Sequence, residues 1–125
     1  MSNTPISTAQ ILPLPMVTAA RLRGVETQIH ALIHELDTIR AAYTELHRNP
    51  AVVAVDQVGD ALAPTTATFE VCCQLDAADR TLRRAVVDIT RAYPYSSRLK
   101  LTAAAARRRE LALTARRRAR TIAAH

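Results

Sequence analysis

The sequence predicts an α+β protein made of a long amphipathic helix, a β-hairpin and a second helix, followed by a basic helix at the carboxyl end. Three observations support this fold class. Apolar residues recur at steps of three and four between Leu22 and Leu46, polarity alternates over residues 68–75, and residues 103–123 combine alanine with arginine and lack glycine and proline. We therefore expect an extended arm over residues 1–16, a core domain over 17–102 and a basic helix over 103–125.

The long helix is the element around which the other predictions are arranged. Its apolar stripe consists of Leu22, Val25, Ile29, Leu32, Leu36, Ile39, Tyr43 and Leu46. This spacing keeps the stripe on one side of an α-helix. Thr18 is suited to the N-cap, and Asn49-Pro50 is suited to the end, because the residue before a proline avoids the helical region. We expect a helix from Thr18 to about Arg48 that must cover its stripe with another surface.

Residues 52–58 and 67–75 are expected to form an antiparallel β-hairpin. The first segment is rich in valine, and turn residues follow at Gly59-Asp60 and Pro64-Thr65. In the second segment, one strand face would hold Phe69, Val71, Cys73 and Leu75. An alternative remains open, in which residues 51–63 form a short helix and 66–92 merge into a long one. That alternative is an all-α helical bundle.

The second helix is expected to begin at Asp76 as its N-cap and to stop at Pro94. Residues 98–102 suit either a short edge strand or the start of the last helix, which Ser96 or Ser97 would then cap. If the amino-terminal arm and residues 98–102 both supply edge strands, the order becomes βαββαβ, a ferredoxin-like sheet with helices on one face.

Charge is distributed unevenly along the chain. The net charge is +6, yet residues 98–125 hold nine basic residues against Glu110 alone, and the preceding residues are mildly acidic. Arginines held close together repel one another, and phosphates relieve that repulsion in a salt-dependent way. We therefore expect a nucleic-acid-binding protein, DNA or RNA, whose phosphate contacts come from Arg107, Arg108, Arg109, Arg116, Arg117, Arg118 and Arg120. Among these, Arg109, Arg116 and Arg120 share one helix side and are expected to contribute most.

The stripe of the long helix also suggests self-association. Its amino-terminal half overhangs strands of seven to nine residues, so we expect a homo-oligomer formed through Leu22, Val25, Ile29, Leu32 and Leu36. The alternative function is a structural or adaptor subunit. In that case the long helix and the arm assemble copies, and the basic tail docks on an acidic protein partner.

Other classes of site are weakly represented. The pair His30 and His34 has the i, i+4 spacing of a zinc ligand pair without further ligands, and Cys72-Cys73 lacks an accompanying base. Gly24 and Gly59 are too few for a glycine-rich phosphate loop. We therefore expect no enzymatic activity, no catalytic residue, no metal and no cofactor. No apolar stretch suits a transmembrane helix, and adjacent cysteines cannot staple a secreted fold, so a cytoplasmic location is expected.

Overall fold

A computed structural model describes residues 11–56 and 58–124 of the chain. This part consists of three α-helices and a short 3-10 helix, and it contains no strand. The elements are α1 (Pro15–Arg48), η1 (Pro50–Val52), α2 (Pro64–Ser96) and α3 (Ala103–Ala123). The prediction of an α+β fold is therefore wrong, and the all-α alternative agrees with the structure.

Helix α1 confirms the predicted long helix and begins three residues earlier than expected. Pro15 takes the first helical position, where its missing N–H is not needed and its fixed φ suits the helix. Thr18 is thus not the N-cap: its backbone N–H and its hydroxyl both donate to the Leu14 carbonyl, each at 3.0 Å. At the other end α1 stops at Arg48, before Asn49-Pro50.

The predicted β-hairpin is replaced by a loop and by the first turns of α2. Val52 ends η1, residues 53–56 have irregular backbone, and Gly59 adopts a positive φ of 88° in the bend at residues 58–60. Residues 67–75 lie inside α2, where 71–73 and 75–79 are all half-buried, and beyond them half-buried residues recur at helical spacing from Leu82 as far as Ser96. The alternation over 68–75 is a short part of that longer helical pattern. Packing along 33 residues outweighs the modest helix propensity of the β-branched residues.

The other boundary predictions around α2 and α3 also need correction. Asp76 lies in the middle of α2 instead of capping it, and the helix continues past Pro94 to Ser96. Pro94 is tolerated because it sits within the last turn, where a single backbone hydrogen bond is lost. Residues 98–102 form neither a strand nor a helix, and Thr102 caps α3 in place of Ser96 or Ser97. Consequently the ferredoxin-like sheet is absent from the described residues, and residues 1–10 of the predicted arm lie outside them.

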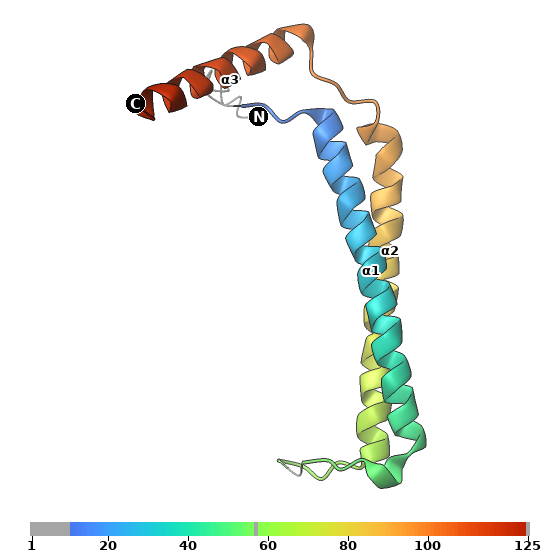
Figure 1. The fold of residues 1–125 in the computed structure, drawn as a ribbon. Coiled ribbons are helices and arrows are strands. Elements are labelled where there is room, and N and C mark those ends of the chain that lie inside the picture. The colour runs from blue at the N-terminus through green and yellow to red at the C-terminus, as the bar shows by residue number, and fades with distance from the viewer. Residues whose placement is uncertain (1–10, 57, 125) are drawn as a thin grey trace. The chain divides into compact units, whose positions relative to one another are not determined.

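The chain divides into two compact units, Leu22–Ala92 and the segments that flank it. Within Leu22–Ala92, α1 and α2 run antiparallel as a helical hairpin (Figure 1). The α1 side of the seam includes Leu22, Ile29, Ile33, Leu36 and Tyr43, and the α2 side includes Leu75, Leu82, Val86 and Ile89. Ile33, which the predicted stripe omitted, is the most buried apolar residue among those described, at 6% exposure.

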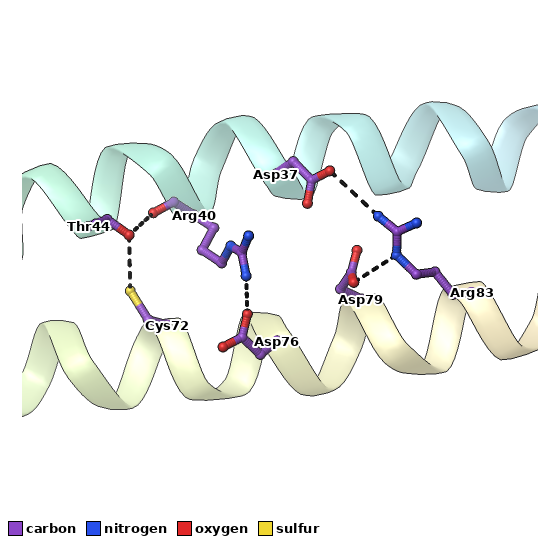
Figure 2. Close-up of polar contacts among 7 residues, drawn as sticks. All are labelled: Asp37, Arg40, Thr44, Cys72, Asp76, Asp79 and Arg83. Atoms are coloured by element: carbon purple, nitrogen blue, oxygen red, sulfur yellow. Dashed lines mark hydrogen bonds and ion pairs between the residues drawn. The ribbon is translucent and has the colours of Figure 1, made fainter.

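Polar contacts fix the register of the hairpin along one of its flanks (Figure 2). Arg40 forms a hydrogen-bonded ion pair with Asp76. Arg83 donates from Nε to Asp79 Oδ2 at 2.9 Å and reaches Asp37 Oδ2 at 3.8 Å. Three of these charged residues come directly after seam positions: Asp37 follows Leu36, Asp76 follows Leu75 and Arg83 follows Leu82.

Candidate nucleic-acid interface

The candidate interface is α3, and its sequence dictates a helix before any tertiary contact is made. Four consecutive alanines open it, and alanine has the highest helix propensity. Thr102 adopts an extended conformation, and its hydroxyl accepts a hydrogen bond from the Ala105 N–H at 3.2 Å. This N-cap satisfies one of the backbone donors that a helix start leaves unpaired.

Only one side of α3 is covered among the described residues. Ala112 is buried, and Ala105, Arg109 and Leu113 are half-buried; these four lie on one side of the helix. Another side of the helix is apolar, consisting of Ala104, Leu111, Ala115, Ala119 and Ile122, and all five residues are exposed. Leu111 and Ile122 are 65% and 76% exposed, so α3 presents most of its circumference to its surroundings.

Arg109 differs from the other arginines of the predicted phosphate-binding set. Its side chain is 20% exposed, and its Nε donates to the backbone carbonyl of Leu12 at 2.9 Å. Its Nη1 also lies 3.8 Å from Glu110 Oε1. The Arg109 guanidinium is therefore occupied in holding α3 against residues 11–14, and sequence spacing alone gave no indication of the Leu12 acceptor.

The remaining arginines of the set are exposed along the length of α3: Arg107, Arg108, Arg116, Arg117, Arg118 and Arg120. No ion pair involving them occurs among the described residues. At 100° per residue these six are spread around the helix instead of gathering on one side. Arg116 and Arg120 share one side of the helix, as predicted. Arg109 lies on the same side nearer the amino end, where that side is partly buried.

The charge balance around α3 is strongly positive. Outside Leu22–Ala92 the sequence contains ten basic residues and a single acidic residue, Glu110. Three acidic residues of the hairpin, Asp37, Asp76 and Asp79, pair with arginines of the hairpin itself. The positive charge of α3 is thus not compensated within its own compact unit.

Arg117 and Arg118 line a shallow, open hollow on α3 together with Thr114, Thr121 and Ile122. The two threonine hydroxyls donate to helix carbonyls one turn earlier, Thr114 to Glu110 at 2.9 Å and Thr121 to Arg117 at 3.0 Å. The guanidinium groups therefore supply the donors of this hollow. A planar guanidinium can donate two parallel hydrogen bonds to a phosphate.

The predicted self-association residues lie on two different parts of α1. Leu22, Ile29 and Leu36 are half-buried and belong to the seam with α2, whereas Val25 and Leu32 are exposed. The rejected sites are placed as follows. His30 pairs with Glu26 at 3.7 Å, both cysteines are free and half-buried, and no metal-binding group of histidine, cysteine or acidic residues occurs among the described residues.

Comparison with known proteins identifies no relative, so the functional argument rests on the surfaces of α3 and α1. No protein family matches the sequence, and no curated protein or solved structure matches it significantly. In the part of the chain that the structure describes, no helix is long and apolar enough to cross a membrane.

Proposed function

We propose that this protein binds nucleic acid through α3, with the exposed arginines contacting phosphates. The observation that carries the proposal is the exposed, uncompensated charge of Arg107, Arg108, Arg116, Arg117, Arg118 and Arg120 on a preformed helix. Each phosphate that such a side chain neutralises releases a condensed counterion. Because the charge surrounds the helix, α3 suits contact with phosphates on two sides, as in a groove of a duplex.

Arg116, Arg117, Arg118 and Arg120 form the principal contact set in this proposal. They lie in the half of α3 where every residue from 114 to 124 is exposed. Arg107 and Arg108 extend the set toward the amino end of the helix. Arg109 acts as a positioning residue through Leu12, and its role is to orient the helix.

Salt-dependent binding tests the proposal. Fluorescence anisotropy with a labelled 20-base-pair duplex, measured between 50 and 200 mM salt, should give a log K that falls linearly with log salt, losing ~0.9 in slope for each neutralised phosphate. The double variant Arg117→Gln/Arg118→Gln should bind less tightly and reduce that slope by about 2.

The matched control is Arg80→Gln/Arg91→Gln, which removes the same charge from exposed positions of α2. It should retain the wild-type slope. Equal losses in both double variants would show that net charge alone attracts the duplex, and an unchanged affinity in the α3 variant would reject α3 as the site.

A second candidate function is an assembling structural or adaptor protein. The exposed apolar residues of α1 favour this function, because phosphate binding by the arginines of α3 does not explain their exposure. In that function α3 docks on an acidic protein surface, and a purified sample free of nucleic acid that forms a salt-stable oligomer would support it over the first candidate.

A further inference from the structure

The flank of the hairpin opposite to the charged one is apolar. On α1, four exposed residues recur every seven positions: Val25, Leu32, Ile39 and Leu46. On α2, four half-buried residues recur in the same way: Val71, Ala78, Ala85 and Ala92. We call these eight residues the apolar strip, and all of them lie within the Leu22–Ala92 unit.

The two rows lie on the same flank because of their positions relative to the seam. Asp37 and Arg83 each follow a seam leucine, and their ion pair shows that residues after the seam meet on one flank. Residues that precede the seam must then meet on the other flank, since the two helices are antiparallel. Leu32 precedes Ile33 and Ala85 precedes Val86, so both belong to that second flank.

The register of the hairpin places large residues beside small ones. Arg40 contacts Asp76, and Thr44 Oγ1 lies 4.0 Å from Cys72 Sγ. Continuing that antiparallel register puts Ile39 level with Ala78 and Leu32 level with Ala85. The strip therefore has a raised row on α1, whose residues are 37–53% exposed, and a low row of mainly alanine on α2.

The size of the strip is that of a protein interface. From Val25 to Leu46 the helix rises about 32 Å, and a face two helices wide gives roughly 600 Å². This footprint is close to the ~800 Å² that each partner contributes to a standard interface. The edges of the strip are formed by Gln28, Glu35 and Ala42 on α1 and by Gln74, Thr81 and Asp88 on α2, so two acidic residues stand among uncharged ones.

We propose that the apolar strip binds the strip of a second copy of this chain, forming a four-helix bundle in which α1 of each copy packs on α2 of the other. A two-fold axis parallel to the helices brings each raised row onto the low row of the partner, at the same height. The strip is thus complementary to itself, as a closed two-fold interface requires. Large side chains facing small ones is also how bundle layers interdigitate.

A second copy would also enlarge the small core of the hairpin. Among its described residues, Ile33 and Thr68 are buried and all others keep more exposure. Two helices alone cover little apolar surface, whereas four surround a core. The strip itself carries no charged residue, and its edges hold only the separated Glu35 and Asp88, so a basic peptide finds no continuous acidic row along it.

The mass of the full chain in solution tests the dimer. Light scattering after size exclusion at ~50 μM, a concentration above a micromolar dissociation constant, should give twice the chain mass of 13.7 kDa. The variant Leu32→Gln/Ile39→Gln should return to the mass of one chain, with helical circular dichroism retained. Val87→Gln changes an apolar residue of similar exposure, 43%, away from the strip and should stay dimeric. A monomeric wild type, or a dimer that survives the double variant, overturns the proposal.

Disulfide trapping tests the arrangement of the two copies. On a Cys72→Ser/Cys73→Ser background, one chain carries Leu32→Cys and another carries Ala85→Cys. The mixture should cross-link between chains, because α1 of one copy lies on α2 of the other, while each chain alone should not. A cross-link formed by the Leu32→Cys chain alone would place α1 on α1 and overturn the arrangement, and so would a dimer that gives no cross-link in the mixture.

Discussion

Arg83 binds one oxygen of Asp79 and leaves the other without a partner. Arg83 Nε donates to Asp79 Oδ2 at 2.9 Å, while Asp79 Oδ1 is buried against the seam and has no hydrogen-bond partner among the described residues. A buried acceptor without a partner costs about 1–3 kcal/mol, whereas the exposed guanidinium of Arg83 returns little because water screens the pair. The pair therefore orders the seam at a net cost in stability.

Asp79→Ala is accordingly expected to raise the free energy of unfolding by about 1 kcal/mol, or roughly 4 °C in melting temperature. Thermal unfolding followed by circular dichroism measures this. Asp88→Ala is the matched control, because Asp88 also pairs with an arginine four residues away, Arg84 at 3.4 Å, but its side chain is 58% exposed. If Asp79→Ala destabilises the protein more than Asp88→Ala does, the buried oxygen is not a cost.

The Arg40–Asp76 ion pair of the charged flank is expected to stabilise the hairpin equally at neutral and moderately alkaline pH. Asp76 raises the pKa of Arg40 above its usual range, first through the hydrogen bond and then through its charge, and Asp79 raises the pKa of Arg83 in the same way. A folded-state pKa above the unfolded value gives stability that is fully present below the unfolded pKa. It is lost only as the pH rises through the folded value, here beyond the usual range of arginine.

Arg40→Gln should therefore lower the melting temperature by the same amount at pH 7 and pH 9.5. Thermal unfolding of the wild type and the variant at both pH values measures the two differences in melting temperature. A decrease that shrinks at pH 9.5 would mean that a group other than this guanidinium titrates in the pair.

Thr68 makes the most buried polar contact of the hairpin, at 5% exposure. Its hydroxyl donates to the Pro64 carbonyl at 3.0 Å, and Oγ1 lies 2.8 Å from His47 Nδ1. Thr68→Val keeps the shape and removes the hydroxyl, so it should cost about 1 kcal/mol, or roughly 4 °C. In the control Thr90→Val, an exposed hydroxyl bonded to the Val86 carbonyl at 2.9 Å is lost, and a change within ~0.5 kcal/mol is expected. Equal losses would rule out a special role for the His47 contact.

Arg109 and Arg117 should respond to mutation in different ways, although both belong to the predicted phosphate-binding set. Arg109→Gln removes the hydrogen bond to the Leu12 carbonyl and should lower the stability of α3 while leaving the salt slope of binding near the wild-type value. Arg117→Gln should leave stability unchanged and reduce the slope by ~0.9. Helix content on heating and anisotropy across salt give the two readouts. The opposite pattern would assign the phosphate contact to Arg109.

Sequence patterns predicted α1 and α3 well because each extends over many turns. The end of α1 at Arg48 and the helical nature of residues 103–123 follow from proline placement and alanine content. The hairpin prediction failed at Phe69–Leu75, where Phe69, Val71, Cys73 and Leu75 alternate with other residues and imitate a strand over seven residues. Leu82, Val86 and Ile89 continue the same helix pattern, and only the pairing of α2 with α1 gives that longer pattern its weight.

The candidate surfaces were predicted in part for a similar reason. The arginines of α3 are evident from composition, but the covering of Arg109 depends on Leu12, a contact across 97 positions of sequence. The stripe of α1 merges two rows, the seam and the raised row, because both repeat every seven residues. The two rows can be told apart only when the position of α2 is known. The sequence does show, in Leu22, Val25, Leu32 and Ile39, that the stripe is wider than one partner helix can cover.

Dimerisation through the apolar strip and phosphate binding by α3 should reinforce each other. A dimer carries two copies of α3, so a duplex long enough to contact both binds the second one intramolecularly. Leu32→Gln/Ile39→Gln should therefore weaken binding to a 40-base-pair duplex by about 100-fold and leave binding to an 8-base-pair duplex, which accommodates one α3, unchanged. Anisotropy titrations with both duplexes at one salt concentration measure the two effects. An equal loss on the short duplex would mean that the variant damages α3 itself, and no loss on the long one would mean that the two α3 helices of a dimer do not act together.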